Sequence, residues 1–200
     1  MIISMKKLLV IVVSVIYILS VMSFAKLFLA DVYYKSARKE LGKGNSTVAI
    51  KYTEKAITLN PNEPAYYRER AKALIGSTLN QEEKVTATLK QWALNNLETS
   101  YKLNTQNLAT IRNNVPTYYF LAVKDLGEPN GLDNLDPAYL SIASKFVEDN
   151  KNYSPTDVGI YVLMAKYEKR LGLEEEYKTT VMQIKELRPD LLEWHPDLLN

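Results

Sequence analysis

The sequence has 200 residues with 25 Lys or Arg, 23 Asp or Glu and no cysteine, which excludes disulfides, thiolate metal sites and cysteine nucleophiles. Three basic residues and no acidic ones lie in residues 1–29, which leaves 22 basic and 23 acidic groups in the remainder. A near-neutral domain gains little from counterion release, so we expect no nucleic-acid partner.

The first segment is strongly apolar: residues 8–25 read LLVIVVSVIYILSVMSFA, without a charge, Gly or Pro. As a helix this run is about 27 Å long, and the apolar residues after Lys26 extend it across a hydrocarbon core of ~30 Å. Residues 1–29 are therefore predicted to form a transmembrane anchor that contacts the lipid bilayer through residues 8–29. The alternative is a signal peptide cleaved after Ala25, but the run exceeds the usual apolar core of ~7–15 residues.

The basic residues around this segment leave its orientation open. Lys6 and Lys7 favour a cytoplasmic N-terminus, whereas further basic residues crowd the other side, namely Lys26, Lys35, Arg38, Lys39 and Lys43. Because long domains are translocated largely regardless of charge, we expect a single-pass membrane protein whose following domain is extracytoplasmic. Lys151 is expected on the surface of that domain.

The domain opens with a predicted helix hairpin. No Gly precedes Gly42 and no Pro precedes Pro61, so the anchor is expected to run with little or no break into the first helix of the domain. Residues 42–45 are a stop-and-turn signal, and Ser46 is a candidate cap for the second helix. Apolar residues in 47–59 follow the spacing of one helical face, and Pro61 ends this helix.

The 34 residues 30–63 resemble a tetratricopeptide repeat. An aromatic residue, small residues, turn residues and a final proline occupy the signature positions, namely Tyr33, Ala37, Gly44, Asn45, Ala49, Ala56 and Pro61. Small residues at helix crossings let neighbouring backbones approach, while an aromatic residue of the first helix fills the space beside them. The resemblance implies a stack of helix pairs with a shared core.

Two further units match this pattern in part. The last unit runs between Pro155 and Pro189, which are 34 residues apart, with Tyr161, Ala165 and Gly172 in matching positions. The second unit begins at Pro64 and carries its aromatic and small residues at Tyr67 and Ala71. Its second helix is predicted to contain Ala93, Leu97 and Leu103.

The third unit is the least regular. We expect Pro116 to start or kink its first helix, with Tyr118, Tyr119 and Ala122 following, and its second helix to begin at Pro137 after a loop at residues 127–136. The predicted fold is therefore all-α, with one N-terminal transmembrane helix followed by a tetratricopeptide-like α-α superhelix of about four helix pairs. The predicted parts are an anchor (1–29), a repeat domain (30–191) and a C-terminal tail (192–200).

A closer resemblance covers roughly residues 20–190. An apolar helix that passes into FLADVYYKSA, a repeat, and then NPNEPAYYR is similar to the C-terminal region of bacterial O-antigen ligase or polymerase-like membrane proteins. Residues 107–126 and the sequence SPTD at 154–157 are also similar. This resemblance implies a role in cell-envelope or surface-polysaccharide assembly. The family's many membrane helices and its catalytic loop have no counterpart here, so no catalytic residue is carried over.

Few residues could carry chemistry. His195 is the single histidine, and its place near the chain end beside Pro196 favours an ordinary surface residue over a catalyst or metal ligand. The acidic run Glu174, Glu175 and Glu176 suits a helix start. The acids near the predicted loop lack the order of a calcium-binding loop, which leaves a weak cation site as the alternative: Asp125, Glu128, Asp133 and Asp136. We expect no cofactor or metal and a binding module rather than an enzyme.

In tetratricopeptide arrays the first helices line a concave groove through repeat positions 2, 5, 9 and 12. These positions place six residues on that face: Tyr34, Arg38, Arg68, Lys72, Lys166 and Lys169. A basic, tyrosine-edged groove suits a carboxylate-bearing peptide, an anionic glycan or a lipid-linked pyrophosphate. The alternative is a solvated helix face that long basic side chains cover.

These observations predict a membrane-anchored scaffold that binds a membrane or envelope protein, such as a glycan polymerase or ligase. One alternative is the C-terminal module of an O-antigen ligase-like enzyme whose catalytic membrane part is encoded elsewhere. A third interpretation is a secreted lipid or glycan binder, released by cleavage after Ala25.

Overall fold

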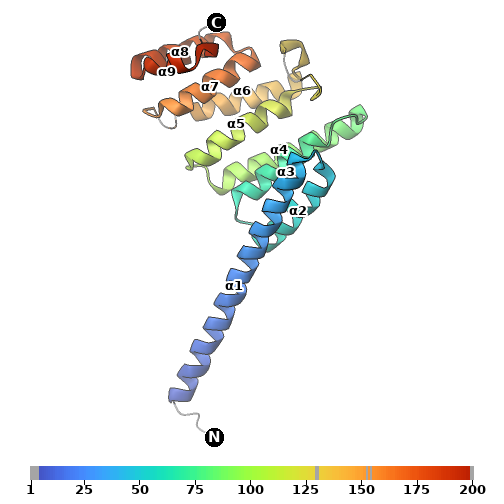
Figure 1. Cartoon of the computed structure of the whole chain (residues 1–200), viewed down its shortest axis with the longest axis vertical. Helices are drawn as coiled ribbons and strands as arrows, with labels where there is room; N and C mark the ends of the chain where they lie inside the picture. Colours follow the sequence, from blue (N-terminus) through green and yellow to red (C-terminus); the bar gives the residue numbers. More distant parts are fainter. Residues whose placement is uncertain (1–4, 129–130, 152, 154, 199–200) are drawn as a thin grey trace.

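The computed structural model describes residues 5–128, 131–151, 153 and 155–198. The main helices are α1 (Met5–Gly42), α2 (Ser46–Leu59), α3 (Pro64–Gly76), α4 (Glu83–Leu103), α5 (Leu108–Ala122), α6 (Pro137–Lys151), α7 (Val158–Leu171) and α8 (Glu174–Leu187). The short elements are η1 (Leu132–Asn134), α9 (Asp190–Trp194) and η2 (Pro196–Leu198). The described residues contain no β-strand, which confirms the all-α class (Figure 1).

Parts of four predicted segments lie outside the described residues. These are residues 1–4 of the anchor, 129–130 of the loop, Ser154 of the SPTD sequence, and residues 199–200 of the tail.

Helix α1 is 38 residues long and runs without interruption from the apolar N-terminal stretch into the packed helices (Figure 1). Its apolar side chains over residues 8–29 are exposed. Ser20 and Ser23 donate their hydroxyls to the carbonyls four residues earlier, which satisfies both within the helix. Among the described residues, α1 is the one helix that is long and apolar enough to cross a membrane. The predicted continuity of anchor and first helix is confirmed.

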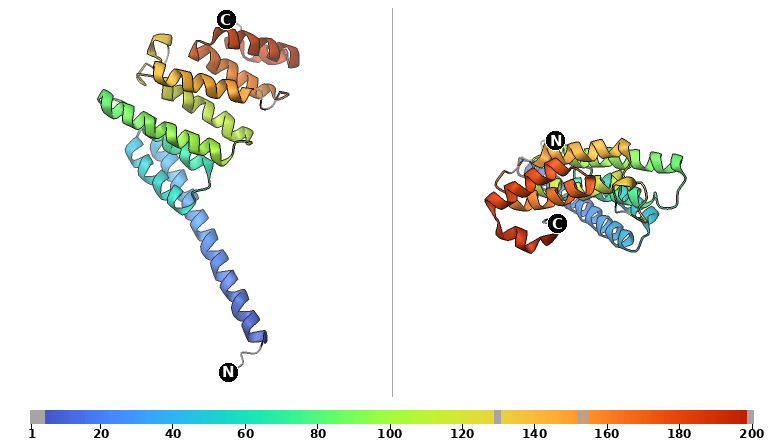
Figure 2. Two further views of the ribbon diagram at one scale, coloured as in Figure 1. Left: turned by 180° about the vertical axis from the view of Figure 1, so that it is seen from behind. Right: turned by 90° about the horizontal axis from the view of Figure 1, so that it is seen from above.

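Helices α1 to α8 form four consecutive pairs, α1–α2, α3–α4, α5–α6 and α7–α8, stacked along the molecule (Figures 1 and 2). The first helices also pack on one another, α1 on α3, α3 on α5 and α5 on α7. Within the described residues, successive second helices make no comparable contact. The first helices therefore form the more closely packed layer, and the array rises away from the apolar stretch of α1 (Figure 1).

Small residues lie where the first three helices cross. All of them are fully buried, namely Ala30, Ala37, Ala49, Ala56 and Ala73. In the second unit, Tyr66 is the buried aromatic residue, at 2% exposure. Tyr67, which was expected to fill that role, is half-buried and donates its hydroxyl to the carbonyl of Pro61 at 3.0 Å. The side chain of the neighbouring residue thus supplies the aromatic packing in this unit.

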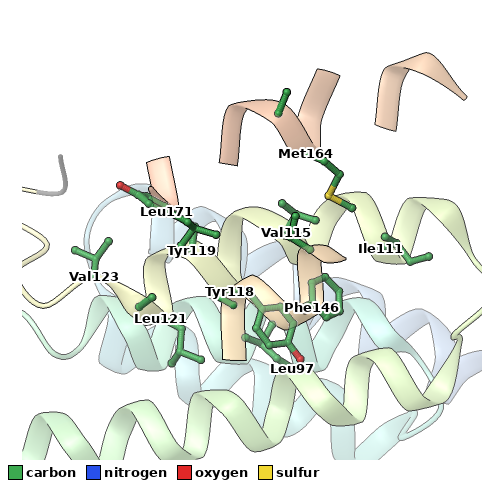
Figure 3. Packing of buried hydrophobic residues seen from close by; sticks show 14 of the residues in the cluster. Leu97, Ile111, Val115, Tyr118, Tyr119, Leu121, Val123, Phe146, Met164 and Leu171 are labelled. Atoms are coloured by element: carbon green, nitrogen blue, oxygen red, sulfur yellow. The ribbon is translucent and has the colours of Figure 1, made fainter. Parts of the chain in front are cut away.

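The main core lies between α3 and α8 (Figure 3). Tyr118 stacks on Phe146 with ring centroids 4.0 Å apart, and Tyr101 meets the same ring edge-on at 5.5 Å. Leu97 of α4 and Met164 of α7 are fully buried. Burial of these large apolar side chains supplies most of the favourable free energy of folding.

The first helix of the third unit does not begin at Pro116. Helix α5 starts at Leu108, where the side chain of Asn107 accepts a hydrogen bond from the backbone N–H of Thr110 and caps the helix. Pro116 lies inside α5, and Tyr118 falls in its last turns rather than its first. The cap and the burial of Ile111 outweigh the local cost of the proline.

The second helix of the first unit also begins differently from expectation. Ser46 is its first residue, and Asn45 occupies the cap position without capping through its side chain. The amide of Asn45 instead donates to the carboxylate of Glu40 at 2.8 Å, which ties the turn to the end of α1.

Candidate partner-binding face

The six residues predicted to line the groove fall into two separate groups. Tyr34 and Arg38 lie on α1 beside residues of α3, whereas Lys166 and Lys169 lie on α7. Helix α5 packs between α3 and α7 and separates the groups. We call the residues of α1 and α3 the proximal group, because they lie nearer to the apolar stretch; its members are Tyr34, Arg38, Arg68 and Lys72.

The proximal group is built around two tyrosine rings. The rings of Tyr34 and Tyr66 lie 5.2 Å apart, and the guanidinium of Arg38 is 5.8 Å from the Tyr34 ring. Burial raises the pKa of the Tyr34 hydroxyl, and the nearby carboxylate of Glu69 raises it further. The guanidinium of Arg68 acts in the opposite direction on this pKa, and Arg68 is only 9% exposed. Arg68 is therefore a packing residue rather than an open contact.

Two carboxylates that the sequence reasoning missed lie beside the proximal group. Asp31 accepts a hydrogen bond of 2.6 Å from the hydroxyl of Tyr66, which helps burial to raise the pKa of that phenol. Glu69, with a side chain 6% exposed, lies 3.6 Å from the amine of Lys72. The repeat pattern could have predicted one of them, because Asp31 occupies repeat position 2, counted from Ala30, which is one of the positions expected to line the groove. The exposed cations that remain are Arg38 and the partly exposed Lys72.

The α7 group contacts the chain's own C-terminal segment. The amine of Lys166 is 3.6 Å from the carboxylate of Asp197 and 3.2 Å from Nδ1 of His195. Lys169 donates to the backbone carbonyl of Asp197 at 2.8 Å. The two lysines predicted to meet a ligand therefore already bind an acidic segment of this chain.

Apolar burial fixes that C-terminal segment in place. Leu192 and Leu198 are 6% and 2% exposed, and the hydroxyl of Tyr177 donates to the carbonyl of Leu198 at 2.7 Å. His195 is half-buried rather than an ordinary surface residue. Residues 190–198 thus pack on the last helix pair (Figure 1).

Buried charges elsewhere in the domain hold helices and loops together. Lys90 donates to the carbonyl of Val123 at 2.8 Å and lies 3.3 Å from the carboxylate of Asp136, while burial lowers the pKa of its amine. Lys151 was expected on the surface, but it is buried and its amine lies 3.0 Å from the carboxylate of Glu168. Burial of a lysine stem in the core cannot be read from its residue type.

The side-chain amide of Asn134 holds the acidic loop together. Asn134 donates to the carbonyls of Asp125 and Glu128 and accepts from the backbone N–H of Asp125. Within residues 5–128, 131–151, 153 and 155–198, no three His, Cys, Asp or Glu side chains are grouped so that they could hold a metal ion.

No protein-family model matches the sequence, and no curated protein is significantly similar to it.

Proposed function

We propose that this protein is a membrane-tethered scaffold that binds a protein partner through the proximal group. The observation that carries the proposal is the continuity of α1, which holds both the apolar stretch and two members of the group. Tyr34 and Arg38 follow Leu29 by five and nine residues, or about 7.5 and 14 Å along the helix. A partner bound there lies within reach of the membrane surface. Tethering of the scaffold to the membrane would raise its effective concentration around a partner in the same membrane.

The chemistry of the proximal group suits an acidic segment of the partner. Arg38 and Lys72 share repeat position 9 with Lys166, counted from Ala30, Pro64 and Val158. At Lys166 that position meets the carboxylate of Asp197 from the chain's own C-terminal segment. A carboxylate of a partner would find the same kind of cation at Arg38 and Lys72, beside two aromatic rings.

The repeat family and the setting belong to the same proposal. The four stacked helix pairs and their buried alanines support a tetratricopeptide-like array. The resemblance of residues 20–190 to O-antigen ligase-like proteins supports a place in envelope or surface-polysaccharide assembly. We further propose that α1 stays in the membrane with the domain on the extracytoplasmic side.

Crosslinking in cells tests the partner site. The variant R38E/K72E reverses the charges of the exposed Arg38 and the partly exposed Lys72, and we expect it to lose a membrane-protein crosslink that the unaltered chain forms. The control is K39E/K84E, which makes the same charge change at exposed positions of α1 and α4. Arg68 is left unchanged, because charge reversal at a 9% exposed residue would unfold the site. Equal capture by R38E/K72E and the unaltered chain would refute the assignment.

A single introduced cysteine tests the topology, because the sequence has none of its own. Lys84 is exposed near the start of α4 and is a better position than the buried Lys151. We expect K84C to react with a membrane-impermeant maleimide in intact cells. Reaction only after lysis would place the domain in the cytoplasm. Extraction of the chain by alkaline carbonate without detergent would contradict membrane insertion itself.

A further inference from the structure

A second surface lies where α1 leaves its apolar stretch. There α1 and α2 form an open groove of about 580 Å³, separate from the proximal group, lined by Leu29, Tyr33, Lys51, Glu54, Lys55, Thr58 and Leu59. Helix α2 packs back along α1 (Figure 1), and Leu59 in its last turn lines the same groove as Leu29. Leu29 is 46% exposed and ends the apolar stretch. The floor of the groove is thus continuous with the surface that faces the bilayer in the proposed membrane-anchored protein.

The wall of this groove carries two lysines that have no ion-pair partner among the described residues. Lys51 and Lys55 are exposed, and neither forms an ion pair within the part of the chain that the structure describes. The amine of Lys55 lies 5.3 Å from the ring of Tyr33, which holds it over the groove. The one carboxylate in the lining, that of Glu54, is paired with Arg70 at 2.8 Å. Two lysines therefore face the groove without a counter-charge.

A third lysine approaches the groove from the membrane side. Lys26, Leu29 and Tyr33 follow the spacing i, i+3, i+7 and so lie along one face of α1. Lys26 is exposed within the last turn of the apolar stretch. A lysine at this depth extends its amine toward the headgroups while its stem stays among apolar groups.

The heights of the lysines match the headgroup layer of a bilayer. Lys55 and Lys51 precede Leu59 by one and two helical turns, which places them about 6 and 12 Å above it along α2. The polar layer on each side of a bilayer is roughly 5–8 Å thick. If Leu29 and Leu59 mark the hydrocarbon boundary, the backbone of Lys55 lies within this layer and that of Lys51 lies above it, so the long stem of Lys51 has to extend down toward the headgroup.

We infer that this groove binds the headgroup of an anionic phospholipid from the leaflet next to the repeat domain. The phosphate would lie between Lys51 and Lys55, with the start of an acyl chain against Leu29. The two lysines without ion-pair partners are opposite in sign to the headgroup phosphate, and the apolar floor suits a lipid rather than a soluble anion. The inference rests on the proposed membrane insertion of α1. Such a lipid would fix the tilt of the domain and hence the direction in which the proximal group faces.

Lipid retention by the purified full chain tests the inference. The chain in neutral maltoside micelles is titrated with short-chain phosphatidylglycerol, with phosphatidylcholine of the same chain length, and with sodium phosphate, and bound species are counted by native mass spectrometry. We expect phosphatidylglycerol to bind at least about tenfold more tightly than phosphatidylcholine, and K51Q/K55Q to remove this preference. The matched control is K35Q/K39Q, which removes two exposed lysines from α1 and should keep the preference.

Three results would overturn the inference: equal retention of the two lipids, an unchanged preference in K51Q/K55Q, or binding of free phosphate without binding of the lipid. Circular dichroism of each variant shows whether the helices are intact, and K55Q alone is the milder substitution if the double variant loses helix. The titration does not depend on insertion in cells. Carbonate extraction of the chain would therefore refute the membrane proposal, while the titration reports on the groove itself.

Discussion

Removal of one partner from the ion pair between Lys151 and Glu168 should strongly destabilise the domain. The amine of Lys151 lies 3.0 Å from the Glu168 carboxylate and 3.1 Å from the hydroxyl of Thr180, so that it links α6, α7 and α8. The side chains are 11% and 1% exposed. Neither charge can regain its hydration when the other is removed.

The size of the effect follows from this burial. Loss of one partner leaves an unpaired charge in the core and costs about 3–5 kcal/mol. K151M and E168Q should therefore each lower the free energy of unfolding by that amount. Replacement of both residues by apolar ones of similar volume, in K151M/E168M, should restore stability to within about 1 kcal/mol of the unaltered chain or exceed it. The pair thus contributes little to the net free energy of unfolding, although removal of either residue alone is strongly destabilising.

Urea unfolding of the full chain in neutral micelles, followed by circular dichroism, measures these differences. The control is K102M, which breaks the exposed pair of Lys102 and Glu98, with side chains 74% and 48% exposed, and should change stability by no more than about 0.5 kcal/mol. Small, additive losses in K151M and E168Q would refute the reasoning, because they would show that water reaches both groups.

Three further predictions concern packing, pH and the C-terminal segment. A165L should lower the free energy of unfolding by about 1–3 kcal/mol, because Ala165 is fully buried where α7 meets its neighbours. A lower urea midpoint would show this loss. Burial raises the pKa of the Tyr118 phenol, while an unfolded tyrosine ionises near pH 10. Stability should therefore fall as the pH rises above about 10. Between pH 9 and pH 11, Y118F should lose less free energy of unfolding than the unaltered chain, as measured by urea titrations at the two pH values. L198A removes a 2% exposed side chain, should cost about 2 kcal/mol and should make residues 190–198 sensitive to protease, unlike L187A at a 42% exposed position.

The helices of this protein could be read from short stretches of sequence. The absence of Gly and Pro predicted that α1 runs from the apolar stretch to Gly42, and Pro61 ended α2 as expected. These signals act within a few residues, so they need no knowledge of the fold. Of the two roles predicted for Pro116, the start of the helix is wrong, because α5 begins at Leu108 after the cap residue Asn107 and contains the proline in its interior.

The candidate site could be predicted only in part. The repeat register placed Arg38 and Lys72 on the layer of first helices, where the structure has them. It could not show that Arg68 is buried, or that Asp31 and Glu69 lie beside the cations. Such neighbours come from adjacent helices, and a periodic pattern gives the direction of a side chain without its surroundings.

The sequence alone determined that the chain is helical, that one helix is apolar enough to cross a membrane, and that the helices come in pairs. Tertiary structure alone decided which charges are paired within the chain and which stay exposed. Lys166 meets Asp197 and Lys151 meets Glu168 across different helices, and each contact neutralises a cation that the sequence presented as exposed. The physical reason is range: caps and helical periodicity act over one or two turns, whereas pairing and burial depend on packing between distant segments.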